Sequence, residues 1–196
     1  PMGGFQGDLS PVTAPELGGA AITAAVKRSG VAPEDVDEVI MGLCLFAGLG
    51  QAPSRQAAHH AGIPWDTGCT TISKMCGSAM KAAMLAHDTI LAGTHDVMVA
   101  GGMESMSNAP YLLPRARAGY RMGHGDQAKD HMFFDGLEDA ETGKLMGAFA
   151  QDMSDKKEYT REQMDEYAIR SLNRAKDAIE KGLNTAEIVP VTVKSR

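Results

Sequence analysis

Apolar residues recur with helical spacing in three long stretches of the chain, at residues 13–30, 77–92 and 160–182. In the first and third stretches the apolar positions lie on one face, which is typical of a helix that packs on a core. In the second, Met, Ala, Leu and Ile residues face most directions, so we expect this helix to be buried nearly all round. Capping boxes begin the first and third helices, and glycines end them; these residues are Thr13 with Glu16, Thr160 with Gln163, Gly30 and Gly182.

Short apolar runs between these helices predict strands, and one amphipathic run predicts a short helix; the strands lie at 36–46, 68–73 and 95–102, and the helix at 54–62. Strands that alternate with helices at this spacing indicate βαβ units and a sheet rich in parallel pairs. We therefore assign the chain to the α/β class. The pattern begins with a loop and a helix, where a first strand would be expected. A last strand is predicted at 187–194, where Pro190 restricts it to a sheet edge.

Residues 103–143 show neither the helical nor the strand period and are rich in Gly, Pro, Met and charge. A loop of this length inside a compact domain is usually functional or inserted. For its basic stretch we favour a solvated loop that forms an interface; the cations are Arg115, Arg117, Arg121 and Lys129. Helical patterning resumes at 144–158.

Charge and composition narrow the class of protein. The 196 residues carry a formal net charge of −6, which argues against nucleic-acid binding because phosphates require a basic surface. No apolar run reaches the roughly 18 residues that a membrane span needs. The chain start lacks the features of a signal peptide, and three cysteines without zinc spacing indicate free thiols, so we expect a cytoplasmic location. We expect His124 and His131 to be solvent-exposed loop residues rather than metal ligands.

Cys76 stands where the strand at 68–73 gives way to the helix at 77–92. Backbone N–H groups at a helix start lack intrahelical partners, and together with the helix dipole they stabilise a thiolate. The same groups can stabilise an oxyanion. A buried structural thiol is the alternative, because cysteine is common in cores. Position alone leaves both interpretations open for Cys76, whereas Cys44, within an apolar strand, and Cys69, at a strand start, are expected to be inert.

Two motifs connect this cysteine to a known family. The stretch "KMCGSAMKA" resembles the nucleophile motif of thiolases, and "VMVAGGMESMSNAPY" resembles the strand and turn that follow their catalytic helix. Further similar segments occur in the family's order: "PMGGFQGDLS", "LGGAAITAAVKRSGV", "GQAPSRQAAHHAGIP" and "FFDGLEDAETGKLMG". The final stretch, "TREQMDEYAIRSLNRAKDAIEKG" with "EIVPV", resembles the inserted loop domain. The resemblance covers essentially the whole chain and is closest to the biosynthetic branch, the acetyl-CoA acetyltransferases.

The resemblance implies an architecture. Thiolases consist of two similar halves stacked in five layers, with a loop domain inserted in the first half. This chain would hold an incomplete N-terminal domain at residues 1–108 and an incomplete loop domain, with CoA-binding and tetramerisation regions, at 109–196. The expected fold is a thiolase-like βαβαβ mixed sheet with a buried helix, lacking its first strand and the second half. We expect part of a longer polypeptide that forms a homo-oligomer, a dimer or a tetramer.

The resemblance also implies a reaction. Cys76 would attack the thioester of acetyl-CoA, and a second acetyl-CoA would then attack the acyl-enzyme to give acetoacetyl-CoA; thiolysis is the reverse. The backbone N–H of Cys76 would contribute to an oxyanion hole. Leu137, Leu145 and Met146 match positions that line the CoA channel. The biosynthetic branch usually has His at the position of Leu145, which bears on acyl-chain preference. The partners would be acyl-CoA substrates, with no nucleic acid, membrane, metal or cofactor.

Other interpretations remain open. A degradative 3-ketoacyl-CoA thiolase shares the fold and the nucleophile, whereas "GGMESMS" argues against a β-ketoacyl synthase. The basic stretch of the long loop would, as an alternative, contact CoA phosphates. The chain is also compatible with a non-catalytic thiolase fragment and, more remotely, with a redox sensor, although no resolving Cys has a recognisable spacing. The family's catalytic histidine and second cysteine belong to the missing half, so we expect this chain alone to be inactive.

Overall fold

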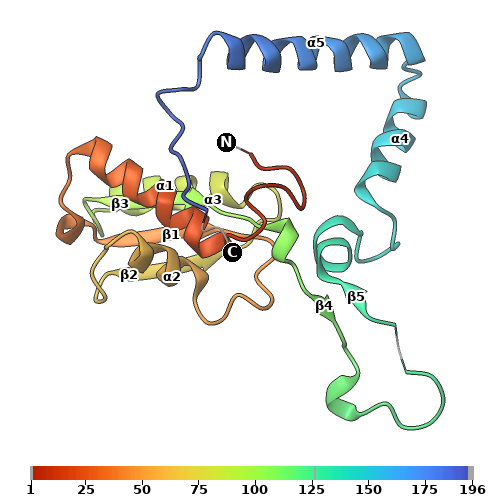
Figure 1. Ribbon diagram of the computed structural model, residues 1–196, viewed down its shortest axis with the longest axis horizontal. Helices are drawn as coiled ribbons and strands as arrows, with labels where there is room; N and C mark the ends of the chain where they lie inside the picture. The colour runs from red at the N-terminus through yellow and green to blue at the C-terminus, as the bar shows by residue number, and fades with distance from the viewer. Residues whose placement is uncertain (1, 126, 194–196) are drawn as a thin grey trace. The chain divides into compact units, whose positions relative to one another are not determined.

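The computed structural model describes residues 2–125 and 127–193. They form two compact units, one comprising Met2–Gly136 with residues 191–193 and the other Leu137–Pro190 (Figure 1). The proposed family domains at 1–108 and 109–196 are defined by the architecture of the longer enzymes and stay a prediction.

A three-stranded parallel sheet is the centre of the first unit. Its strands are β1 (Glu38–Gly42), β2 (Gly68–Ile72) and β3 (Met98–Gly102), in the order β2-β1-β3. The carboxyl ends of all three strands meet, because Gly42 of β1 pairs with Ile72 of β2 and with Gly102 of β3. This arrangement confirms the α/β class and the parallel pairing that the sequence predicts.

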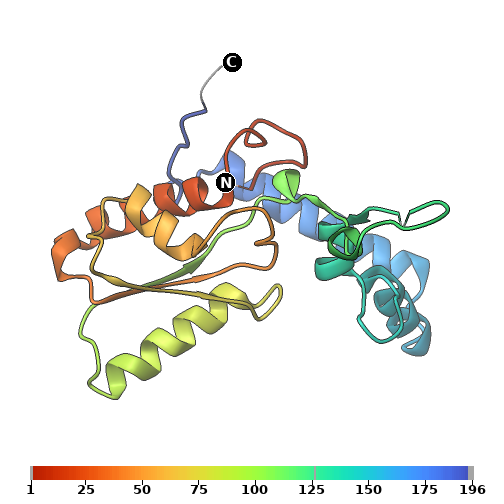
Figure 2. The same cartoon turned by 90° about the horizontal axis from the view of Figure 1, so that it is seen from below.

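Helices cover both faces of this sheet. On one face lie α1 (Ala14–Ser29), with Thr13 as its N-cap, and α2 (Pro53–His60); on the other lies α3 (Ser78–Leu91) (Figure 2). The predicted caps of α1 are present, since Thr13 and Glu16 exchange hydrogen bonds and Gly30 adopts the left-handed conformation. Short 3₁₀ turns occupy Pro33–Asp35, Met106–Asn108 and Ala116–Ala118.

The core lies between the sheet and the α1–α2 layer. Side chains alternate along a strand, so Val39 and Met41 of β1 point into this core while Ile40 and Gly42 face α3. The cluster of buried side chains from the strands and both helices includes Ile22, Val26, Val39, Met41, Leu43, Ala57, Ala58 and Ile63. Burial of these groups fixes α1 and α2 against the sheet.

The other face of the sheet admits α3 at very close range. A Cβ on Gly42 would lie 2.3 Å from the backbone carbon of Ser78, and one on Gly102 would lie 2.7 Å from Cβ of Ala79. Only glycine therefore permits the first turn of α3 to rest on the strand ends. Cys76 lies in the segment that precedes the helix. The contact between α3 and the strand ends therefore fixes the distance of this segment from the sheet.

The expectation that α3 is buried nearly all round is wrong for this chain. Ser78, Ala82 and Ala86 are buried, whereas Met80 is 72% exposed and Leu91 is 74% exposed. The physical reason is that one sheet contacts only one stripe of a helix. The opposite apolar stripe of α3 is open to solvent.

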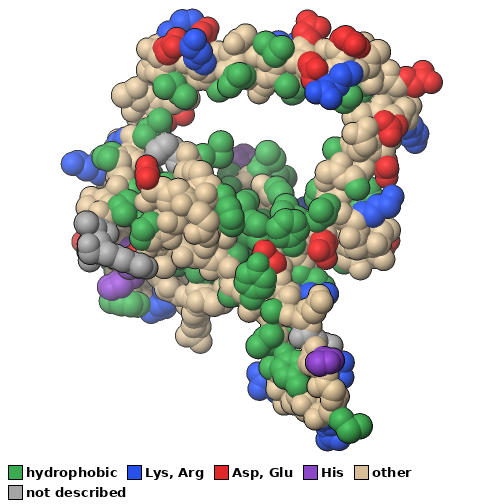
Figure 3. All heavy atoms as spheres, turned by 45° about the vertical axis from the view of Figure 1, so that its right-hand side comes forward, with side chains coloured by type: hydrophobic (Ala, Val, Ile, Leu, Met, Phe, Trp, Pro, Cys, Tyr) green, Lys and Arg blue, Asp and Glu red, His purple; other side chains and the backbone are tan. Residues whose placement is uncertain are grey.

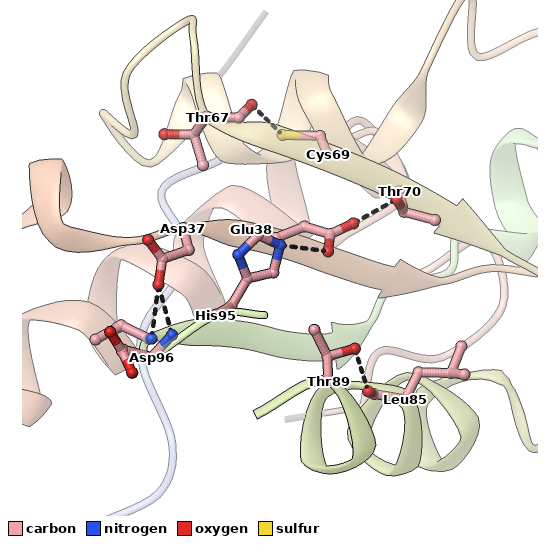
Figure 4. A network of polar contacts seen from close by, with 10 residues as sticks. Asp37, Glu38, Thr67, Cys69, Thr70, Leu85, Thr89, His95 and Asp96 are labelled. Atoms are coloured by element: carbon pink, nitrogen blue, oxygen red, sulfur yellow. Dashed lines mark hydrogen bonds and ion pairs between the residues drawn. The ribbon is translucent and has the colours of Figure 1, made fainter. Parts of the chain in front are cut away.

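Polar contacts tie the strands together at their amino ends (Figure 4). The Asp37 carboxylate accepts hydrogen bonds from the backbone N–H groups of Asp96 and Val97, and these bonds hold its pKa below the usual range. Glu38 accepts a 2.6 Å bond from Thr70 and lies 3.5 Å from Nε2 of His95. These contacts join the strands at their amino ends, whereas Cys76 follows the carboxyl end of β2.

Residues 103–136 contain little regular structure, as the sequence predicts. They include a two-stranded antiparallel ribbon of β4 (Tyr111–Leu112) and β5 (Lys129–Asp130), followed by a π-helical turn at Met132–Leu137. Arg115 and Arg121 are exposed and line a depression of about 290 Å³.

The second unit contains α4 (Met146–Lys156) and α5 (Arg161–Glu180), and Thr160 with Gln163 forms the predicted capping box of α5. Neither helix has a buried residue, and hydrophobic side chains lie among charged ones on the surface of α5 (Figure 3). The strand predicted at 187–194 is absent from residues 187–193, and Lys194 lies outside the described residues. Pro190 lacks the N–H that a strand ladder needs. No helix within the described ranges is long and apolar enough to cross a membrane.

Candidate active site

Cys76 lies in a tight turn, residues 73–78, which joins the carboxyl end of β2 to the start of α3; we name it the cysteine turn. Its backbone closes on itself, because Gly77 N–H donates to the carbonyl of Lys74 and Ser78 N–H donates to the carbonyl of Met75. The Ser78 hydroxyl, which is buried, secures both sides of the turn. It donates to the Met75 carbonyl at 2.6 Å and accepts from the Lys74 N–H at 2.8 Å.

The residue before the cysteine adopts an unusual backbone conformation. Met75 has a φ of 50°, in the left-handed region that non-glycine residues rarely enter. Such conformations persist where the surroundings enforce them, and they concentrate at functional sites. Here the bonds through Ser78 enforce it, and the result is that the Cys76 side chain is exposed.

The start of α3 leaves room for an anionic group. Gly77 is the N-cap residue and supplies no side-chain cap, and the first turn of the helix contains no acidic residue. The positive end of the helix dipole therefore favours negative charge near Cys76, one residue before the cap. Sequence reasoning predicts this placement; the roles of Cys76 as nucleophile and oxyanion donor stay predictions.

Cys44 is closer to this site than the sequence indicates. The strand predicted at 36–46 ends at Gly42, so Cys44 lies in the following loop, residues 43–50, which we name the β1 loop. Glu104, Ser78 and Cys76 all lie close enough to influence the pKa of its thiol. Burial and the negative charge of Glu104 raise the pKa of the Cys44 thiol, which disfavours the nucleophilic thiolate.

Glu104 explains why β1 ends where it does. Its carboxylate accepts hydrogen bonds from the N–H groups of Cys44 at 2.8 Å and of Leu45 at 3.0 Å, so these groups bond to a side chain instead of a neighbouring strand. Sequence reasoning did not identify Glu104. A signal was available, since Glu104 is a charged residue two positions after the strand β3, and sites form at the carboxyl ends of parallel strands.

Cys69 lies away from the cysteine turn, one residue into β2, and its thiol is 3.5 Å from the Thr67 carbonyl oxygen (Figure 4). Burial raises the pKa of this thiol. The geometry of Cys69 agrees with the inert role expected for it.

His131 corrects the expectation of two exposed loop histidines. His124 is exposed, but the side chain of His131 is only 5% exposed. Its Nδ1 lies 2.6 Å from Oδ2 of Asp135, and its Nε2 accepts from the N–H of Ala47 at 3.3 Å. The residue is buried because the π-helical turn folds it against the β1 loop. No group of three metal-ligating side chains occurs in the described part of the chain.

A depression of about 340 Å³ adjoins the cysteine turn. The β1 loop and the end of β2 both contribute to it; its lining residues are Phe46, Gly50, Ala52, Pro53, Thr71, Ile72 and Ser73. The lining is mainly apolar with a few hydroxyl groups, a composition that is common in small-molecule sites.

The three predicted channel residues belong to the unit Leu137–Pro190. A β-bridge between Glu138 and Leu145 closes a short loop, which brings Leu137 near Leu145 and Met146. Leu137 is half-buried, and Leu145 and Met146 are 42% and 47% exposed, so Leu145 and Met146 are accessible on the surface of this unit. Their role in a CoA channel stays a prediction.

The comparisons with known proteins agree with this arrangement. The family described as "Thiolase, N-terminal domain" matches residues 1–196. Acetyl-CoA acetyltransferase 2 of Arabidopsis thaliana is 52% identical over 193 residues, which cover 98% of this chain and 48% of that protein.

Two further relatives have a similar sequence identity and a similar coverage. Acetyl-CoA acetyltransferase of Cupriavidus necator is 47% identical over 195 residues, 100% of this chain and 49% of that protein. The mitochondrial acetyl-CoA acetyltransferase of Bos taurus is 46% identical over 193 residues, 98% of this chain and 45% of that protein. The chain thus spans about half the length of the curated relatives it matches.

Proposed function

The chain belongs to the thiolase family, and from this premise we propose that it supplies the nucleophile of an acyltransferase that makes acetoacetyl-CoA from two acetyl-CoA molecules, or catalyses the reverse thiolysis. The observation that carries the proposal is the exposed thiol of Cys76 on a turn fixed at the carboxyl ends of parallel strands. The relatives' shared name, acetyl-CoA acetyltransferase, supports acetyl-CoA as the substrate.

The proposed reaction proceeds in two stages. The Cys76 thiolate adds to the thioester carbonyl of acetyl-CoA, and the collapsing intermediate expels CoA thiolate, which takes up a proton, leaving acetyl-Cys76. A second acetyl-CoA then loses an α-proton, and its carbon attacks the acetyl group. This step forms acetoacetyl-CoA and returns the Cys76 thiolate. The backbone N–H of Cys76 contributes to stabilising the oxyanions.

The proton acceptor for the second stage comes, in this proposal, from outside the unit that holds Cys76. None of the six histidines hydrogen-bonds to the cysteine turn among the residues that the structure describes. His131 and His95 have carboxylate partners elsewhere, and His59 stacks on Trp65 with ring centroids 3.7 Å apart. The chain by itself is therefore proposed to form an acyl-enzyme at most, without sustained condensation.

Trapping the acyl-enzyme tests the proposal. The intact protein is incubated with acetyl-CoA, quenched in acid and digested, and the cysteine peptides are analysed by mass spectrometry. We expect the acetyl group on Cys76 in the wild type and in Cys44→Ser, the matched control. Acetylation of Cys44 instead, or of no cysteine, would contradict the proposal.

A 3-ketoacyl-CoA thiolase that accepts longer acyl chains is the second candidate. It is favoured by Leu145, an accessible apolar residue where the biosynthetic branch usually has His. The two candidates share the nucleophile and differ in chain preference. Comparison of kcat/KM for thiolysis of acetoacetyl-CoA and of 3-ketoacyl-CoA esters with longer chains separates them.

A further inference from the structure

We propose that His131 is a positioning residue for Cys76: its neutral imidazole holds the β1 loop against the cysteine turn, without touching substrate. The catalytic consequence rests on the acyl-transfer function proposed above, whereas the positioning itself does not. The observation behind it is a buried imidazole, 5% exposed, whose two ring nitrogens both have partners.

The two partners require one protonation state. The Ala47 N–H is a donor, so Nε2 of His131 must carry a lone pair to accept from it at 3.3 Å. Asp135, a carboxylate acceptor 2.6 Å from Nδ1, then fixes the proton on that nitrogen. The neutral imidazole with its proton on Nδ1 satisfies both contacts at once, and no other state does.

Hydrogen bonds hold the backbone that carries the imidazole. The N–H of His131 donates to the Pro110 carbonyl, and the N–H of Met132 donates to Oδ1 of Asp130 at 2.9 Å. The following turn packs on the β1 loop as well, since a Cβ on Gly136 would lie 3.2 Å from Cδ2 of Leu45. The His131 side chain can therefore hold Ala47 in a fixed position relative to the segment that carries the imidazole.

The β1 loop connects this contact to the nucleophile. Glu104 holds the loop at Cys44 and Leu45, and His131 holds it three residues after Cys44, at Ala47. The loop begins at Leu43, whose N–H donates at 3.0 Å to the carbonyl of Ile72, the last residue of β2, and the cysteine turn starts at the next residue, Ser73. Loss of the Ala47 contact frees the middle of the loop, while Glu104 at Cys44 and Leu45 and the Gln56 side chain at Leu49 still hold its two ends. A loosened middle allows the surroundings of the Cys76 thiol to shift.

Amide hydrogen exchange of the intact protein tests the positioning directly. In His131→Gln the side-chain amide oxygen can accept from Ala47 N–H and does not titrate, whereas His131→Leu has no acceptor. We expect Ala47 protection to fall by roughly 2- to 12-fold in His131→Leu and to remain in His131→Gln. His124→Leu, at an exposed histidine of the same loop, is the matched control and should leave Ala47 unchanged.

Rescue by the glutamine variant separates positioning from a general structural role. Ala47 protection that falls as far in His131→Gln, which keeps an acceptor, as in His131→Leu would overturn the proposal. Where His131→Leu fails to fold, wild-type Ala47 protection in His131→Gln together with its loss in His131→Ala decides the same question.

Reactivity of the nucleophile completes the test. If acetyl transfer occurs, His131→Leu should lower kcat by roughly 10- to 100-fold with a smaller change in KM, and His131→Gln should restore most of the loss. The rate of Cys76 alkylation by iodoacetamide should change in His131→Leu in either case. If acetyl transfer is absent but Cys76 alkylation changes in His131→Leu, only the proposed function is refuted. If Cys76 alkylation and Ala47 exchange are both unchanged in His131→Leu, the role of His131 is refuted.

Discussion

Substitution of Gly42 by Ala tests whether close packing of α3 on the sheet sets the position of Cys76. The added Cβ would lie 2.3 Å from the backbone carbon of Ser78 and 2.5 Å from the backbone nitrogen of Ala79. Because ordinary contacts begin at 3.4 Å, the start of α3 must move by about 1 Å. The obstructing atoms are backbone, so no side-chain rotation relieves the contact.

The expected magnitude follows from this displacement. Overpacking costs roughly 1–3 kcal/mol, and Ala in place of a strand Gly recovers roughly 0.5–1 kcal/mol, so the net loss of stability is roughly 0–2.5 kcal/mol. A shift of about 1 Å at a reacting group lowers turnover by roughly 10²-fold. Since a 10²-fold loss corresponds to about 2.7 kcal/mol of activation free energy, Gly42→Ala should impair activity at least as much as stability.

Gly68→Ala in the neighbouring strand β2 is the matched control. Its Cβ would meet Cγ of Glu38 at 3.6 Å, an ordinary contact, and we expect a gain of roughly 0–1 kcal/mol. Thermal unfolding and the alkylation rate of Cys76 should be measured for both variants of the intact protein. Equal unfolding midpoints and equal Cys76 reactivity in the two variants would refute the reasoning.

Three further predictions concern the thiols and the proposed channel. Cys76→Ser should lower turnover by several orders of magnitude with the fold intact, and steady-state kinetics in which Cys44→Ser causes the larger loss would reverse the assignment. In timed peptide mapping near neutral pH, iodoacetamide should label the exposed Cys76 before Cys44 and Cys69. The raised pKa values of the Cys44 and Cys69 thiols keep them protonated until the pH is more alkaline. Equal labelling rates for the three cysteines would contradict this prediction. Leu145→His should change KM for acyl-CoA esters more than Leu183→His, an exposed control in the same unit, and equal KM values would place Leu145 outside the channel.

Features that depend on near neighbours in the chain could be predicted from sequence. The capping boxes at Thr13 and Thr160 form as expected, because the two residues that make each cap are three positions apart. The parallel strands follow from their alternation with helices. The length of β1 could not be predicted, since its end is set by Glu104, which bonds to Cys44 across 60 positions of sequence.

By itself, the sequence determined the α/β class, the helices with their caps, and a cysteine immediately before a long apolar helix. Tertiary structure alone decided what surrounds that cysteine: Cys44 near its thiol, Glu104 on the adjacent loop, and His131 buried against Ala47, 84 positions away. It also decided that one stripe of α3 is open to solvent. The physical reason is that periodicity and caps report local backbone geometry, whereas a single side chain that bonds a distant backbone N–H leaves no period in the sequence. Burial of a helix, likewise, depends on how many surfaces the fold brings against it.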